Sequence, residues 1–152
     1  MALFSPLDWL RSRSSTVSCR TALSSQPSLE AAVNEVTANL KGNSSADLAL
    51  VFASTHYASD LPRLLPLLQR RLKATHWLGC AGDGVIGTTA EGNTSELERR
   101  TALSITMLQL PGAVLKPFCL ETDSLPDLDG PAQQWQEWVG ADPFNTRSML
   151  VF

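Results

Sequence analysis

The pattern of hydrophobic and polar positions in the first third of the chain predicts strands that alternate with helices. In residues 16–24 apolar and polar side chains alternate, which is typical of a half-buried strand. Between Leu29 and Leu40 apolar residues recur at i, i+3 and i+4, and Gly42 follows, which predicts an amphipathic helix with a glycine cap. Residues 47–54 form a continuous apolar run, which predicts a central strand covered on both faces.

A second helix is predicted after Ser59, a residue type that suits the N-cap position. Pro66 falls inside this helix and is expected to kink or split it. Short strands are expected at 76–80 and 84–89, joined by a glycine-rich loop. The side chains expected to face inward from the helix are Leu61, Leu64, Leu65, Leu68 and Leu72.

The remaining pattern predicts antiparallel strands and one more helix. Residues 101–110 alternate as a strand, and a turn at Pro111 and Gly112 is expected to return 113–120 as its antiparallel partner. The other expected elements are a charged turn or short helix at 96–100, a loop at 121–130, a helix at 131–139 and a strand at 147–152. The predicted fold class is therefore α/β, with a mixed sheet of about six or seven strands and at least three flanking helices, in which a βαβα start precedes antiparallel strands.

Composition narrows the function classes. The chain has 152 residues, of which 43% are hydrophobic, enough for one domain with a buried core. A net charge of -3 without a basic run argues against nucleic-acid binding, and no apolar stretch reaches the roughly 18 residues of a membrane span. Three widely spaced cysteines and two histidines indicate a reducing compartment, without a disulfide framework or a metal centre. We expect a cytoplasmic protein without a cofactor.

Residues 1–15 are expected to be an extension or a cap on the domain, which then spans 16–152. The first 26 residues are rich in serine, carry three arginines and have Asp8 as their one acid. That composition is also typical of an organelle transit peptide, which is the alternative for this segment.

Four of the chain's nine glycines lie between Trp77 and Glu91, at positions 79, 82, 84 and 87. Residues 82–87 fit the G-x-G-x-x-G template of dinucleotide sites, but that template counts only where it opens a helix. Here the residues around Gly87 are β-branched, which favours a strand, and Asp123 lies too far along the chain to bind a ribose. The nucleotide hypothesis is therefore rejected.

The backbone N–H groups around Gly79, Gly82 and Gly84 could instead form a concave nest that captures a carboxylate. The alternative is a tight crossing between two strands that needs small residues for packing.

Cys80 lies inside this stretch and is a candidate nucleophile, with His56 or His76 as its base and Asp83 to orient that base. The alternative is a small buried thiol without chemistry, which we favour, so we expect no catalytic activity.

Polar residues follow the central strand, and such positions commonly line the ligand crevice of an α/β sheet. Ser54, His56 and Tyr57 are therefore candidate ligand contacts. The alternative is structural: Ser54 caps a turn and Tyr57 covers the edge of the core.

Four blocks in a fixed order resemble the N-terminal half of a FIST domain, a prokaryotic sensory domain also found in some eukaryotic F-box proteins. The blocks are 21–24 with 29–33, 47–54, 78–87 with Glu91, and 102–106 through 110–112. The resemblance covers roughly residues 16–120, and it implies that a C-terminal FIST half is missing from this chain. It also implies that Glu91 orients a ligand amine, for which the alternative is a solvated turn residue.

The resemblance implies a sensory domain that binds a small ligand, an amino acid or small carboxylate, and signals to a partner protein or to the missing C-terminal FIST half. A second hypothesis is an interaction or scaffold domain that captures a protein through the edge near Phe152 and the helix carrying Trp135 and Trp138. A third is the cysteine-dependent enzyme.

Overall fold

The computed structural model describes residues 16–40, 45–119 and 121–152, so the extension expected at 1–15 lies outside the described residues. The chain divides into two compact units, Met1–Ala113 and Val114–Phe152, called unit 1 and unit 2 below. Each unit is described by itself.

Unit 1 has α/β architecture, as the sequence predicts. Its elements in chain order are β1 (Ser18–Ser24), α1 (Leu29–Asn39), β2 (Ala46–Ser54), the 3-10 helix η2 (Thr55–Asp60), α2 (Leu61–Gln69), β3 (Ala74–Gly82), β4 (Gly84–Thr88), β5 (Thr94–Glu98) and β6 (Leu103–Gln109).

Four strands form a mixed sheet in the order β1-β6-β2-β3. The last strand in sequence, β6, lies between β1 and β2 and is antiparallel to both, whereas β2 and β3 are parallel and joined through α2. The other two strands, β4 and β5, form a separate antiparallel ribbon. The prediction of a mixed sheet is confirmed, but the described strands are divided between two sheets.

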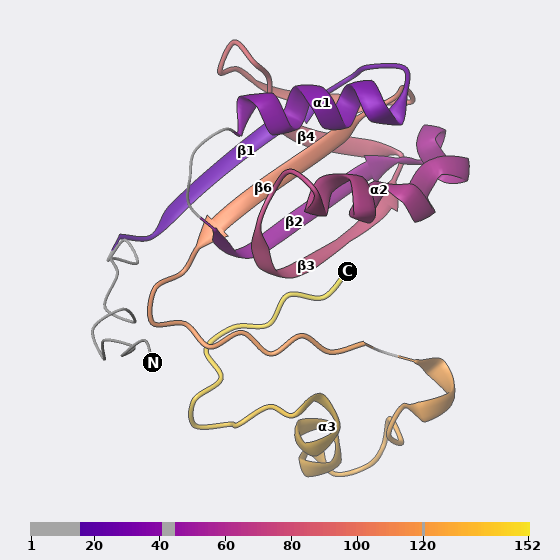
Figure 1. Ribbon diagram of the computed structural model, residues 1–152. Helices are drawn as coiled ribbons and strands as arrows, with labels where there is room; N and C mark the ends of the chain where they lie inside the picture. The colour runs from indigo at the N-terminus through magenta and orange to yellow at the C-terminus, as the bar shows by residue number, and fades with distance from the viewer. Residues whose placement is uncertain (1–15, 41–44, 120) are drawn as a thin grey trace, which may run out of the picture. The chain divides into compact units, whose positions relative to one another are not determined.

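The two faces of the four-stranded sheet carry different layers. Figure 1 shows α1 and α2 on one face, where Ala22 of β1 and Ile105 of β6 join their buried core. Leu23 is the next residue of β1 and therefore points to the opposite face, where it packs with Val85 of β4. Helices, sheet and ribbon thus make three layers.

The helix α1 follows its prediction closely. Ser28 has an extended backbone, and its hydroxyl accepts a hydrogen bond from the Ala31 N–H at 3.3 Å, which is N-cap geometry. The residues at i, i+3 and i+4 are buried against the sheet: Leu29, Ala32, Val33 and Val36.

The second helix departs from its prediction in three ways. Asp60, and not Ser59, precedes α2, because residues 55–60 already form η2. Leu65 is exposed rather than inward, because Leu64 and Leu68 define the buried side of so short a helix. Pro66 does not split α2, since the carbonyl that its ring crowds, four residues back, belongs to the first turn.

Two further expectations are wrong. The segment expected to be a charged turn or short helix is the strand β5, because Leu97 pairs with Val85 and packs inward while Glu96 and Glu98 face outward. Residues 113–119 form no strand, because both edges of β6 are already occupied by β1 and β2.

Unit 2 contains the 3-10 helix η3 (Thr122–Ser124) and the predicted helix α3 (Ala132–Val139), which ends at Gly140 with φ 65°. Trp135 and Trp138 meet edge to face, with ring centroids 6.2 Å apart. The strand expected at 147–152 is absent, and its apolar side chains are exposed. Across the described residues of both units, no helix is long and apolar enough to cross a membrane.

Candidate functional site at the carboxyl ends of β2 and β3

Two candidate segments that are distant in sequence meet at the carboxyl ends of the parallel strands β2 and β3. The strands end at Ser54 and Gly82, which are paired in register. Directly after them, the Thr55 hydroxyl donates a 2.8 Å hydrogen bond to Oδ1 of Asp83. Both residues are exposed, so this carboxylate is fixed in position and open to solvent. The carboxyl ends of parallel strands are where α/β sheets commonly bind ligands.

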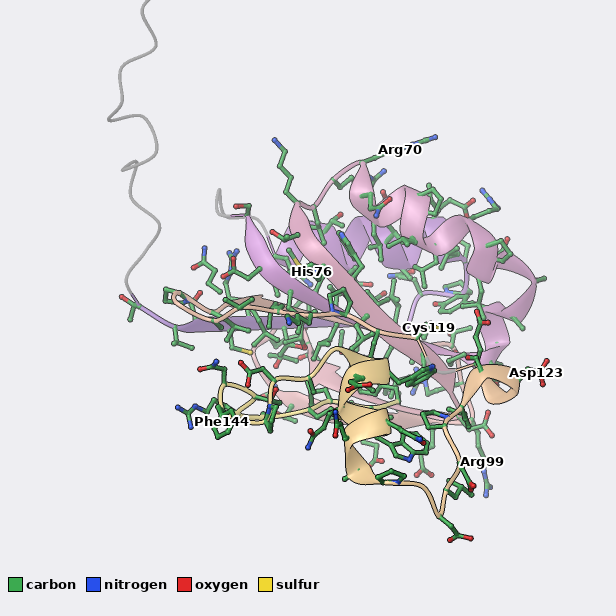
Figure 2. The ribbon with its side chains drawn as sticks, turned by 90° about the horizontal axis from the view of Figure 1, so that it is seen from below. Arg70, His76, Arg99, Cys119, Asp123 and Phe144 are labelled. Carbon is green, nitrogen blue, oxygen red and sulfur yellow. The ribbon has the colours of Figure 1, made fainter. Side chains whose placement is uncertain are left out.

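Charged groups surround Asp83. The Arg99 N–H donates to the Asp83 carbonyl at 3.3 Å, and Arg99 has a positive φ of 55°, a backbone angle rare outside glycine. Glu96 and Glu98 of β5 lie beside Gly84, since a Cβ added there would be 3.7 Å from Glu98 Cγ and 3.9 Å from Glu96 Oε1. Arg99 is labelled in Figure 2. The bend is therefore rich in carboxylates, and Arg99 joins it through its backbone.

The glycine-rich segment forms no anion nest in this structure. A nest is formed by successive backbone N–H groups in an αR-αL or turn conformation. Gly79 and Gly82 lie in the strand β3 and Gly84 in the strand β4, and none of the three has a positive φ. Gly79 lies inside β3, where a Cβ would come 1.8 Å from the Val51 carbonyl oxygen of β2, so only glycine fits. The alternative of close strand packing accounts for this position.

Two candidates from the polar run after β2 are used inside the fold. Ser54 is fully buried, and its hydroxyl accepts a 3.0 Å hydrogen bond from the Ala102 N–H. Tyr57 is also buried, its hydroxyl donates to the Gln26 carbonyl, and burial raises its pKa. Both residues therefore have structural roles, but Ser54 does not cap a turn as expected, because its hydroxyl makes no cap hydrogen bond at the start of η2. His56, between them, is exposed on η2 and remains available to a ligand.

Cys80 is exposed on β3, so the expectation of a buried thiol is wrong. Among the described residues β3 ends the sheet, so the strand carries Cys80 at an open edge. His76 precedes it by four residues on the same strand, which separates their Cα atoms by about 13 Å and places the imidazole beyond hydrogen-bond reach.

Glu91 lies at the tip of the β4–β5 hairpin, beside Gly92 with φ 85°. The Thr89 hydroxyl is the main cause that lowers the pKa of Glu91, followed by its own backbone N–H. The whole of β4 separates this tip from Asp83, so the structure does not bring Glu91 together with the other candidates.

Thr55 and Arg99 were not among the predicted site residues. Thr55 lies between the candidate residues Ser54 and His56, so its place in the sequence could have identified it as a site residue. No sequence signal identified Arg99, because its contact with Asp83 exists only when residues 94–98 form the strand β5 and pair with β4.

A groove with a volume of about 310 Å³ lies between α2 and β3, was not predicted from the sequence, and is called the α2–β3 groove below. Its lining is apolar and includes Leu61, Leu64, Leu65, Trp77, Gly79 and Cys80. A second hollow of about 360 Å³ lies at the amino ends of β2 and β3, beside Lys73 and Trp77. Among the described residues, no group of three or more His, Cys, Asp or Glu side chains could hold a metal ion.

The family model of the FIST N domain matches residues 47–134, which is more than half of the chain. The chain belongs to the FIST family. The matched segment contains β2, β3 and the bend at Asp83, so the candidate site lies inside the FIST N domain. FIST domains are generally sensory domains in signal transduction. No curated protein and no solved structure gives a significant match.

Proposed function

We propose that this FIST domain senses a small zwitterion or carboxylate, with a free amino acid as the best fit, at the carboxyl ends of β2 and β3. The observation that carries the proposal is the Thr55–Asp83 hydrogen bond, which holds an exposed carboxylate at the place where parallel sheets bind ligands. The sensory role of the family supports it.

The charges around the bend favour an amino acid over a simple carboxylate. Oδ1 of Asp83 accepts the hydrogen bond from Thr55, and Oδ2 is the oxygen that would bind a ligand ammonium. Glu98 adds negative charge nearby. The backbone of Arg99 adjoins Asp83, and we propose that its guanidinium pairs with the ligand carboxylate. A carboxylate ligand without an amine would be repelled by the carboxylates of Asp83 and Glu98, and it would have no positive group to offset that repulsion.

Signalling requires a ligand with different affinities for two conformations. Thr55 is the first residue of η2, and its hydrogen bond to Asp83 holds the start of this helix in place. A ligand that competes for Asp83 would weaken that hydrogen bond. The following helix α2 has no side-chain cap at Asp60, which leaves η2 and α2 without the fixed start that Ser28 gives α1. We propose that this segment passes the ligand state to a signalling partner protein.

The test is a thermal-shift screen of the chain against the common amino acids and small carboxylates. A ligand that binds only the folded state stabilises it by about 2.7 kcal/mol at a hundredfold excess over its dissociation constant. We expect one amino acid to raise the melting temperature, and Asp83→Asn and Gly84→Val to abolish the shift. A Cβ is accommodated at position 84 in the empty protein, because its nearest contacts there are ordinary.

The control is Glu91→Gln, at the far end of the ribbon. It is expected to keep the shift. If Glu91→Gln loses the shift and Asp83→Asn keeps it, the ligand binds at the hairpin tip and the site proposed here is wrong.

A second candidate function is an interaction domain without a small ligand. It is favoured by the exposed apolar side chains of unit 2, among them Phe144, Met149, Leu150 and Val151. A cooperative melt without any ligand shift would favour this function. The cysteine-dependent enzyme stays a third hypothesis, for which rapid alkylation of Cys80 at neutral pH is the discriminating measurement.

A further inference from the structure

The open edge of β3 has an unusual composition. Among the described residues β3 ends the sheet, with β2 on one side and no strand on the other. Its nine residues, Ala74–Gly82, contain neither a charge nor a proline. Proteins commonly protect an open edge with charged residues, prolines or bulges. The opposite edge strand, β1, does carry a charge, Arg20, in its interior.

The ends of β3 carry opposite charges. Lys73 directly precedes the strand, with Arg70 and Arg71 just before it at the end of α2. Figure 2 labels Arg70, at the end of α2, and His76, in β3. Asp83 directly follows the strand, near Glu96 and Glu98, and these three carboxylates outnumber the neighbouring Arg99 and Arg100.

We propose that β3 pairs with β3 of a second copy of this chain, antiparallel about a two-fold axis through Leu78. In that register Lys73 of each copy lies opposite Asp83 of the other, so one contact makes two identical ion pairs. Parallel pairing would instead bring Lys73 against Lys73 and Asp83 against Asp83. The charges therefore select the antiparallel arrangement, which is also the self-complementary one that closes as a dimer.

The same register matches the side chains between the charged ends. Trp77 of each copy lies opposite Gly79 of the other, and an aromatic side chain across an edge glycine is a known way to fix strand register. Gly79 and Trp77 also line the α2–β3 groove, so the indole of the second copy enters a surface that is already apolar. Leu65 of α2, exposed and part of that groove, extends the contact above the sheet.

This inference does not rest on the proposed ligand, although the ligand ammonium and Lys73 of the second copy would compete for the same Oδ2 of Asp83. Asp83 uses Oδ1 for Thr55, which leaves Oδ2 for Lys73 of the second copy. The opposite charges at the two ends of β3 favour a second copy of this chain as its partner. A monomeric chain would instead favour a strand from another protein.

The first measurement is the mass of the full chain by sedimentation equilibrium over a range of concentrations. We expect a species of twice 16.5 kDa that dissociates on dilution. Lys73→Glu should give a monomer, since it places like charges at both ends of the paired strands. Arg70→Glu is the matched control and should remain a dimer, because it makes the same change of charge at a position that is not opposite Asp83 in the proposed register. The double exchange Lys73→Glu with Asp83→Lys should restore the dimer.

The second measurement tests the register. In a background in which Cys19, Cys80 and Cys119 are replaced by serine, Leu78→Cys should form an intermolecular disulfide on oxidation, because directly opposed Cα atoms are about 4.5–5.5 Å apart. Thr75→Cys is the control, since two such positions would be about 20 Å apart. A monomeric wild-type chain, or a crosslink at Thr75→Cys without one at Leu78→Cys, would overturn the proposal.

Discussion

Two parts of the glycine-rich segment differ in what their glycines do. In the strands β3 and β4, Gly79 and Gly87 face atoms so close that any side chain would collide: 1.8 Å to the Val51 carbonyl oxygen and 2.7 Å to Ser104 Oγ. Gly82, the last residue of β3, and Gly84, the first of β4, flank the bend at Asp83 and are called the bend glycines below; they have only ordinary contacts, the nearest at 3.6 and 3.7 Å. The strand glycines are fixed by packing, and the bend glycines are not.

The difference shows where a functional test should be made. A substitution at Gly79 or Gly87 damages the sheet and says nothing about a ligand. A substitution at Gly82 or Gly84 leaves the fold intact and changes the surface next to Asp83, so a lost ligand response there would report on the site.

The largest expected effect is that of Gly79→Ala. Its Cβ would overlap backbone atoms of β2, which cannot move as a side chain does, so β2 and β3 must separate. We expect a loss of about 3 kcal/mol or more in the free energy of unfolding, measured by urea denaturation. A variant as stable as wild type would mean that β3 is not held against β2 as described.

A smaller loss is expected for Gly87→Ala. The new methyl group meets Ser104 Oγ at 2.7 Å and Leu23 Cβ at 2.9 Å, and both are side-chain atoms that can shift. We expect a loss of about 1–3 kcal/mol in urea denaturation. Adding Ser104→Ala should recover part of it, because the nearest colliding atom is then gone. A double variant no more stable than Gly87→Ala would contradict this packing.

The bend glycines should respond with the opposite sign. Neither Gly82 nor Gly84 has a positive φ, so alanine fits the backbone at both positions. Alanine restricts the unfolded chain, and we expect Gly82→Ala and Gly84→Ala to leave stability unchanged or to raise it by up to about 1 kcal/mol. Destabilisation as large as that of Gly87→Ala would remove the contrast between the two groups of glycines.

The smallest effect concerns Glu91 at the end of the segment. The Thr89 hydroxyl and the Glu91 backbone N–H lower the pKa of this carboxyl in the folded state below the ordinary 4.5. The stability it contributes is therefore complete above pH 4.5 and is lost as the pH falls through the lower folded pKa. We expect Glu91→Gln to unfold slightly more readily than wild type at neutral pH, and the difference to vanish in acid. A difference that persists in acid would contradict this origin.

Sequence reasoning succeeded where a pattern repeats within one element. The helical spacing from Leu29 to Val36, the apolar run of β2 and the alternation of β6 each contain enough residues to define a buried side. The α/β class and the family followed from these elements and their order.

Sequence reasoning failed where the outcome depends on a distant segment. Residues 113–119 were expected to pair with β6, and no local pattern shows that β1 and β2 already occupy both of its edges. Glu96 and Glu98 indicated a solvated turn, because no local pattern shows that Leu97 between them pairs with Val85 of β4 and packs inward. In the same way, Ser54 was a candidate ligand contact until Ala102, 48 residues away, was seen to donate to its hydroxyl.

The position of β6 also has a consequence for synthesis of the chain. This strand completes the sheet by joining β1 to β2, yet its partner residues in β1 precede it by as many as 91 positions. While the ribosome is still adding residues before Leu103, β1 and β2 have no strand between them, and the face of α1 that covers them has no complete surface to pack on. Folding of unit 1 must therefore wait until β6 has left the ribosomal tunnel, and until then the apolar strands of the nascent chain are exposed to non-native contacts.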